Sequence, residues 1–234
     1  MRDFRLFKNA VYFPKSGICT ISDLHIGLED KLNKQGISFP FEERKSLVNN
    51  LKKVKEKFEP NKFVFNGDTL HTFGEIPDKV PEKLDEIISI CNEECLFIKG
   101  SHDSMLPYLL EERDLEIKES YEYSGLKFIH GDKDLTELDD ELIVIGHEHP
   151  SVEIHGDKID CCLYEKGKSC IFSIIVLPSF SKLTKGVVIN DMKLRDFMSP
   201  VLRNCNTFAD FRLKIELNGE ELEFPSLKKF KDKL

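Results

Sequence analysis

The sequence predicts an α/β fold in which two β-sheets pack face to face and helices cover their outer sides. The first half of the chain alternates short apolar runs with amphipathic segments, the order expected of a parallel sheet with helical crossovers. From Leu115 onward the pattern changes to short apolar runs without helices between them, which is typical of strands. The two patterns together favour two packed sheets.

The elements of the first half follow one another in the order strand, helix, strand, helix, strand. An apolar run at 17–21 precedes a helix predicted for 41–58, whose apolar residues recur at helical spacing on one face. Pro60 and Asn61 stop this helix before a strand at 62–65. The remaining elements are a second amphipathic helix, a third strand and a short helix, at 82–90, 96–98 and 105–112.

The second half contains strand candidates alone, at 115–118, 121–123, 126–129, 142–145, 151–154, 170–177, 187–189, 208–216 and 221–224. The sequence shows no internal repeat, no low-complexity segment and no linker. We therefore expect residues 1–234 to form a single domain, of a size that can bury a full core.

The composition is that of a globular protein, with 40% hydrophobic and 32% charged residues. No apolar run approaches the roughly 20 residues of a membrane helix, so we expect no membrane association. The first nine residues lack the apolar stretch of a signal peptide, which favours a cytoplasmic protein. With 34 basic and 42 acidic residues the net charge is −8, so the surface as a whole does not attract nucleic acid. A nucleic-acid substrate would depend on local basic patches and bound cations.

The cysteines do not form an evident framework, because their number, seven, is odd. Cys161, Cys162 and Cys170 lie close together in the sequence and raise the alternative of a structural zinc site. Two adjacent cysteines have poor spacing for tetrahedral coordination, and no fourth ligand is evident. We therefore expect reduced thiols.

Five short clusters of Asp, His and Gly each follow an apolar run, where a strand is expected to end. Open α/β sheets place their sites at the carboxyl edge of the strands, so the clusters should meet at one rim. A single cluster is a weak signal, because Asp68 alone could cap a helix and His130 alone could be a core histidine. Five in succession favour a metal site. The clusters are Asp23-Leu24-His25, Gly67-Asp68, Gly100-Ser101-His102-Asp103, His130-Gly131-Asp132 and Gly146-His147-Glu148-His149.

In their order and spacing these clusters resemble the motifs of the calcineurin-like metallophosphoesterase superfamily. Further segments are similar to a narrower group, the archaeal SbcD-related phosphoesterases and the bacterial DNA-ligase-associated metallophosphoesterases. These segments are Gly27-Leu28-Glu29-Asp30, Gly36-Ile37-Ser38-Phe39-Pro40, His149-Pro150 and Leu177-Pro178-Ser179-Phe180. The resemblance covers residues 4–227 and implies a calcineurin-like four-layer sandwich, in which two packed mixed β-sheets are flanked by helices.

The resemblance also implies two divalent metal ions that share the carboxylate of Asp68. The expected ligands of one ion are Asp23, His25 and His149. Those expected for the other ion are His130, His147 and either Ser101 or a water molecule. Ser101 stands where the family has an asparagine, and a serine hydroxyl is a shorter and poorer neutral ligand.

His102 is the histidine that the resemblance leaves without a metal. It is expected beside the phosphate, where it would give a proton to the leaving oxygen or stabilise its charge. Asp103 would hold the His102 ring. Glu148 should point away from the two histidines that flank it. His71 and His155 match no ligand position and are expected to be structural, although His71 follows the second cluster closely enough to face substrate. Lys182 and Lys185 either meet a substrate phosphate or are solvated, and the second is expected.

A mixed set of carboxylate, imidazole and water ligands suits Mn²⁺, Fe²⁺, Zn²⁺, Co²⁺ or Ni²⁺ more than Mg²⁺ or Ca²⁺. The resemblance favours Mn²⁺ and predicts hydrolysis of phosphodiester bonds in nucleic acid or nucleotides by a metal-bridging hydroxide. It also implies DNA repair partners. Two alternatives stay open: a hydrolase of 2′,3′-cyclic nucleotides or other small phosphoesters, and a binding scaffold on the same fold, which Ser101 alone favours.

Overall fold

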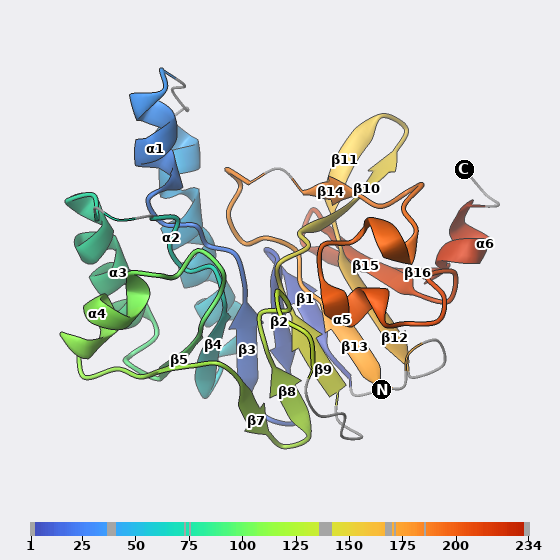
Figure 1. The fold of residues 1–234 in the computed structure, drawn as a ribbon, viewed down its shortest axis with the longest axis horizontal. Helices are drawn as coiled ribbons and strands as arrows, with labels where there is room; N and C mark the ends of the chain where they lie inside the picture. The colour runs from blue at the N-terminus through green and yellow to red at the C-terminus, as the bar shows by residue number, and fades with distance from the viewer. Residues whose placement is uncertain are drawn as a thin grey trace.

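Two large β-sheets and one small sheet organise the chain in the computed structural model (Figure 1). The structure describes residues 3–36, 41–72, 74, 76–135, 142–166, 170, 172–184 and 186–231, and only the backbone of 41–45 and 231. Most of the motif at 36–40 and the lysine at position 185 lie outside the described residues. None of the helices in these ranges is long and apolar enough to cross a membrane.

The first sheet has six strands and is parallel from β3 to β6, as the alternating pattern predicts. Its first two strands are antiparallel additions at one edge that the sequence pattern did not predict. In sheet order the strands are β1 (Arg5–Phe7), β2 (Ala10–Phe13), β3 (Ile18–Ile21), β4 (Lys62–Asn66), β5 (Cys95–Ile98) and β6 (Ile117–Lys118).

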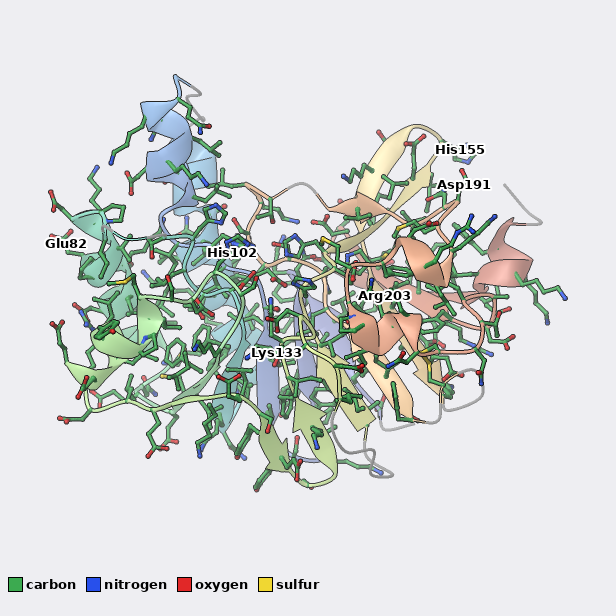
Figure 2. All side chains as sticks on the ribbon, viewed as in Figure 1. Glu82, His102, Lys133, His155, Asp191 and Arg203 are labelled. Carbon is green, nitrogen blue, oxygen red and sulfur yellow. A yellow bond between two sulfur atoms is a disulfide. The ribbon has the colours of Figure 1, made fainter. Side chains whose placement is uncertain are left out.

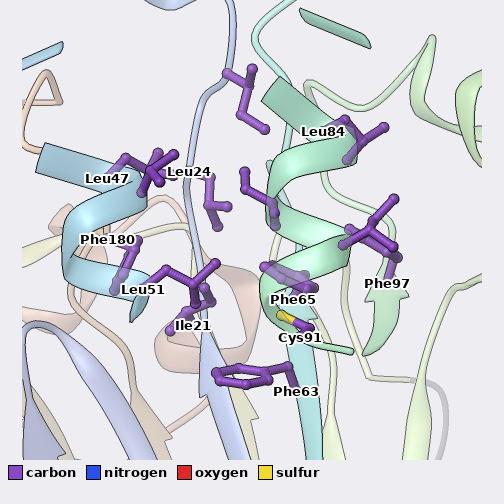
Figure 3. Packing of buried hydrophobic residues seen from close by; sticks show 14 of the residues in the cluster. Ile21, Leu24, Leu47, Leu51, Phe63, Phe65, Leu84, Cys91, Phe97 and Phe180 are labelled. Carbon is purple, nitrogen blue, oxygen red and sulfur yellow. The ribbon is translucent and has the colours of Figure 1, made fainter. Parts of the chain in front are cut away.

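Helices α2 (Phe41–Phe58), α3 (Lys79–Ile90) and α4 (Leu106–Glu111) connect the parallel strands and cover the outer face of this sheet (Figure 1). Figure 3 shows part of this packing, in which helix and strand side chains meet: Leu47, Leu51, Leu84, Phe63, Phe65 and Phe97. The start of α3 precedes the predicted one, because Pro81 falls in the first turn, where no backbone N–H partner is needed. A short helix that was not predicted, α1 (Leu28–Lys34), follows β3.

The second sheet has seven strands and is mixed: β9 pairs in parallel with β8 and β13, and the other pairs are antiparallel. In sheet order its strands are β16 (Glu220–Ser226), β15 (Arg212–Leu217), β12 (Cys162–Lys166), β13 (Ser173–Val176), β9 (Leu142–Ile145), β8 (Leu126–Phe128) and β7 (Tyr121–Tyr123). A small third sheet, which was not predicted, contains β11 (Asp157–Asp160), β10 (Pro150–Ile154) and β14 (Val187–Val188).

The inner faces of the two large sheets pack against each other, which confirms the predicted sandwich. One buried cluster joins them, with Phe13, Val64 and Ile98 from the first sheet and Phe128 and Val144 from the second. The outer face of the second sheet is covered by η1 (Leu194–Asp196), α5 (Pro200–Arg203) and α6 (Leu227–Lys231). The layers are therefore helices, sheet, sheet, helices.

The expectation of reduced thiols is wrong for Cys170, which forms a disulfide with Cys205. The pairing joins residues 35 positions apart, and only the approach of α5 to the second sheet brings them together. The zinc alternative also fails, because the Cys170 sulfur is bonded and the other two thiols point to different sides of the sheet. Cys161 lies in the core beneath α5, and Cys162 lies in the core between the sheets.

Candidate metal centre

The loops that follow β3, β4, β5, β8 and β9 meet at one rim of the sandwich, where the sequence predicted the clusters to converge. Backbone hydrogen bonds hold the loops together: Asp23 donates its N–H to Gly67 O (3.0 Å), and His25 donates to Asp68 O (3.0 Å). Across the sheets, the His147 N–H donates to Asp23 Oδ2 (3.3 Å). Both large sheets therefore contribute side chains to one site.

The backbone at this rim adopts conformations that non-glycine residues rarely use. Five of the predicted ligands have positive φ values: Asp23 (60°), His25 (49°), Asp68 (49°), His147 (68°) and His149 (46°). Such strain is typical of functional sites, where the surrounding structure holds the side chains in place. Here the inter-loop hydrogen bonds supply that support.

Two glycines of the motifs are required by close contacts between the loops. A Cβ at position 67 would lie 2.1 Å from His130 Nδ1, and one at position 100 would lie 2.2 Å from Asp68 Oδ1. Neither contact is compatible with any side chain. The glycines therefore let the loops after β4, β5 and β8 approach closely enough for Asp68 and His130 to meet.

The first candidate ligand group contains Asp23, His25 and His149, whose ligand atoms all lie within 4.8 Å of one another. His149 Nε2 is 3.0 Å from Asp23 Oδ1. Apart from this contact, the buried atoms Asp23 Oδ1, His25 Nε2 and His149 Nε2 have no hydrogen-bond partner among the described residues. Buried polar atoms are normally paired, so three ligand atoms that converge on one point with no other polar partner fit a cation.

The second candidate group contains Asp68, His130 and His147, again with ligand atoms within 4.8 Å of one another. His130 Nδ1 donates to the Asn66 carbonyl (3.2 Å), which leaves Nε2 to face Asp68 Oδ2 at 3.3 Å. A histidine that donates one ring N–H to a carbonyl has the other nitrogen oriented for a metal. The residues of both groups therefore fit divalent ions.

Burial and mutual charge shift the pKa values in both groups. Burial disfavours the charged ring of His130, but the carboxylates of Asp68 and Asp23 outweigh burial and raise its pKa to about 9. At His25 burial dominates and lowers the pKa to about 4. Burial also opposes the ionised form of Asp68, but His130 and the backbone N–H of His102 outweigh it and lower the pKa of Asp68. Two ionised carboxylates beside imidazoles form a site with strong affinity for cations.

Ser101 lies at the edge of the second group. Its Oγ is 3.5 Å from Asp68 Oδ1 and 3.4 Å from Asp68 Oδ2, longer than a typical hydroxyl–carboxylate bond. The Asp68 carboxylate instead accepts a closer bond from the backbone N–H of His102 (2.8 Å). Ser101 is therefore placed beside the predicted site without a strong contact to it.

His102 lies next to both groups and remains accessible, with 31% of its side chain exposed. Its Nε2 is 3.8 Å from Asp68 Oδ2. The ring packs edge-on against His25, with centroids 5.3 Å apart, and stacks on His71 at 4.6 Å. An accessible imidazole beside the ligands is what a proton donor to a substrate requires.

Asp103 has a different role from the expected one. Its Oδ1 accepts the N–H of Leu70 (2.8 Å), and its Oδ2 accepts the N–H of Gly100 (2.9 Å). Both carboxylate oxygens are thus used to join the loops after β4 and β5. Burial raises the pKa of Asp103 to about 6, although these hydrogen bonds oppose the shift. Asp103 therefore positions the loop that carries Ser101 and His102, and it does so through the backbone.

His71, which matched no ligand position, is part of the site. Its Nδ1 is 3.1 Å from His25 Nδ1, on the side of the His25 ring that faces away from the first group. The signal in the sequence was its position three residues after Asp68. His155 is exposed in the turn between β10 and β11 (Figure 2), and Lys182 pairs with Asp160 at 2.8 Å.

Glu148 points away from the ligands, as the alternation of the motif predicts. It is buried and accepts the backbone N–H of Ser199, next to the start of α5. The Ser199 hydroxyl in turn donates to the carbonyl of Gly131 (2.6 Å). This contact fixes the loops that carry His130, His147 and His149 to the outer helical layer.

Comparison with known proteins gives the class of this chain. The family model of the calcineurin-like phosphoesterases matches residues 18–172, and the chain belongs to that family. Membership implies a hydrolase of phosphoester bonds, and the family generally binds two divalent metal ions, in agreement with the two ligand groups. A search of curated proteins finds no match.

Solved structures match the chain at low sequence identity. The chain is similar to the nuclease MPE of Pseudomonas putida, with 16% identity over 95% of this chain and 96% of that chain and a TM-score of 0.68. An uncharacterised protein of Streptococcus pneumoniae that is a predicted phosphoesterase matches at 14% identity, over 89% of this chain and 96% of that chain, with a TM-score of 0.39. Vacuolar Protein Sorting 29 of Cryptosporidium parvum matches at 14% identity, with 89% and 97% covered and a TM-score of 0.38.

Proposed function

We propose that this chain is a divalent-metal-dependent phosphodiesterase that acts on nucleic acid or nucleotides. The observation that carries the proposal is the pair of Asp/His groups, in each of which the three ligand atoms lie within 4.8 Å of one another. Asp23, His25 and His149 would hold one ion, and His130 and His147 the other. Asp68 would serve both, because its charge acts on His25 and His149 of the first group as well as on His130.

A bound pair of divalent ions supplies charge that activates the attacking water and polarises the phosphoryl group. The side chains of the protein orient the substrate and move the protons. His102 is accessible beside Asp68, so its ring can donate a proton to the departing oxygen. Asp103 holds the backbone of that loop through Gly100, and His71 stacks on the His102 ring. These contacts limit the positions from which His102 can reach the substrate.

The nucleic-acid half of the proposal has separate support. It rests on the motifs similar to those of the SbcD-related and DNA-ligase-associated groups, and on the shared fold of a nuclease, MPE of Pseudomonas putida. Mn²⁺ is proposed as the metal because the resemblance favours it among the ions that suit a mixed set of carboxylates and imidazoles. DNA repair partners, on the resemblance alone, and a cytoplasmic location complete the proposal. The complete Asp/His set argues for catalysis over a binding scaffold.

The test is hydrolysis by the metal-stripped protein after reloading with Mn²⁺. Bis-p-nitrophenyl phosphate, p-nitrophenyl phosphate and 2′,3′-cyclic nucleotides are assayed in parallel. We expect Mn²⁺-dependent hydrolysis, fastest with a diester. The matched control is His155→Asn, which removes an exposed histidine outside both groups and keeps a residue that tolerates its φ of 53°. Hydrolysis of the monoester alone would contradict the diesterase assignment, and no hydrolysis with any metal would favour the scaffold alternative.

A further inference from the structure

A pocket of about 500 Å³ opens beside the metal centre, between α1 and the loop after β4. We call it the α1 pocket and define it by Lys31, Lys34, Gln35, His71 and Thr72. Helix α1 leaves the sheet at the end of β3 and rises above the strand ends, so the pocket lies on the side of the molecule that carries the site (Figure 1). Neither the metal ligands nor His102 lines it.

His71 connects this pocket to the candidate metal centre. One ring nitrogen of His71, Nδ1, lies 3.1 Å from His25 Nδ1, and the other, Nε2, lies 3.3 Å from Lys31 Nζ. The order of groups from the centre outward is therefore His25, His71 and Lys31. A group bound at Lys31 would be separated from His25, a member of the first ligand group, by only the imidazole ring of His71. That spacing suits neighbouring parts of one extended substrate.

The lining of the pocket is basic, in contrast to the net charge of −8 of the chain. Lys31 and Lys34 are three residues apart on a helix and so share a face, and Asp30 is the one carboxylate of the described lining. Lysines in the last turn of a helix often only stabilise it through the helix dipole. Here, however, the ammonium group of Lys31 turns to His71 and thus toward the site. Gln35 and Thr72 add neutral polar groups, which suit the oxygens of a phosphate.

We propose that the α1 pocket binds a second phosphate group of the substrate, next to the phosphodiester that is cleaved. The natural substrate would then be a nucleic-acid strand or an oligonucleotide, because 2′,3′-cyclic mononucleotides and simple diesters carry only one phosphate. This inference rests on the proposed phosphodiesterase function and specifies its substrate. It also gives an acidic protein a way to hold a polyanion, since the two lysines on one face of α1 and the metal ions would supply local positive charge.

The first experiment measures binding without catalysis. Fluorescence anisotropy follows a fluorescein-labelled oligothymidylate with the metal-free full-length protein across a salt titration. The test variant is the double substitution Lys31→Ala/Lys34→Ala, and the matched control is Lys228→Ala/Lys229→Ala, which removes two exposed lysines from α6. Each phosphate contact contributes about 0.7 to the slope of log K against log[salt] for a single strand. We expect the test variant alone to lose up to about 1.4 of this slope. Lys31→Arg/Lys34→Arg should keep it, because the charge remains.

The second experiment compares Mn²⁺-loaded enzymes on TpT, pTpT, TpTp and bis-p-nitrophenyl phosphate. Wild type should have a KM roughly tenfold lower for pTpT or TpTp than for TpT, and the phosphate position that gives the gain shows the strand direction. Lys31→Ala/Lys34→Ala should lose that gain, whereas Lys228→Ala/Lys229→Ala should keep it. Circular dichroism melts check that each variant is folded.

The outcomes separate the two proposals. Hydrolysis of bis-p-nitrophenyl phosphate with equal KM values for the three dinucleotides would overturn the α1 pocket and leave the phosphodiesterase function standing. No hydrolysis of any substrate would overturn the proposed function. The metal-free binding data would still decide whether the α1 pocket binds phosphate. Equal salt slopes for wild type and Lys31→Ala/Lys34→Ala, or no binding by wild type at low salt, would contradict the pocket directly.

Discussion

The sharpest consequence of the site geometry concerns the charge of Asp68. Asp68→Asn keeps the volume of this buried side chain and an oxygen that can accept the N–H of His102, 2.8 Å away. It removes the negative charge that faces His130 Nε2 at 3.3 Å and His102 Nε2 at 3.8 Å. The substitution therefore tests the shared charge with little change of shape.

The size of the effect follows from Coulomb attraction. A unit charge 4 Å from another is attracted by about 4 kcal/mol at the effective dielectric constant of about 20 that suits protein sites. Solvation of the freed ion offsets part of this, so we expect the affinity for Mn²⁺ to fall by roughly 10²–10³. Since Asp68 is assigned to both ions, the content of both should fall. Diesterase activity should fall with it.

Metal content after reconstitution and gel filtration, together with titration calorimetry, measures this loss. The control is Asp160→Asn, which neutralises a carboxylate that pairs with Lys182 and belongs to neither ligand group. It should keep about two equivalents of metal. If Asp68→Asn also keeps two equivalents, with an affinity within a factor of about three of wild type, the assignment of a shared carboxylate is wrong.

Three further predictions test the other residues of the site. His102→Ala should keep its metal but lose about 10²–10⁴ in turnover, more for nucleoside alkoxides than for p-nitrophenolate, which leaves without a proton; equal losses for both leaving groups would contradict a proton donor. Ser101→Asn should raise Mn²⁺ affinity at the second group and shift a manganese titration of diesterase rate to lower concentrations, and an unchanged titration would show that the amide is not needed. The pKa of His130 is raised to about 9 in the metal-free protein, so its ring is protonated at neutral pH and must lose the proton to bind metal. Calorimetry should therefore show Mn²⁺ affinity rising about tenfold per pH unit from pH 7 to 8 and levelling above pH 9, and a flat profile would contradict the assignment of His130.

Local patterns were sufficient for the elements that bury one continuous face. Helix α2 covers the predicted range because Leu47, Leu51 and Val54 repeat at helical spacing over a long segment. Strand β9 also matches its prediction, since a short run of apolar residues indicates a strand that is buried on both faces. In the same way the strand-end clusters predicted that these aspartates and histidines gather at one rim, because parallel strands bring their carboxyl ends together there.

Features that depend on long-range contacts were not predictable in this way. The disulfide of Cys170 depends on where α5 lies, and no local pattern specifies a partner 35 residues away. The role of Asp103 depends on the loop after β4, because the backbone N–H of Leu70 in that loop donates to one of its carboxylate oxygens. His71 is part of the site because that same loop places its ring next to the ring of His25.

The sequence by itself thus determined the fold class, the order of the main elements and the residues available as metal ligands, since periodicity and residue type are local properties. Only the tertiary structure decided which of those residues face one another and which carboxylates accept backbone N–H groups. It alone also decided that a basic pocket adjoins the site. Those outcomes depend on distances between loops of different strands. The packing of the two sheets sets these distances, and no short segment encodes them.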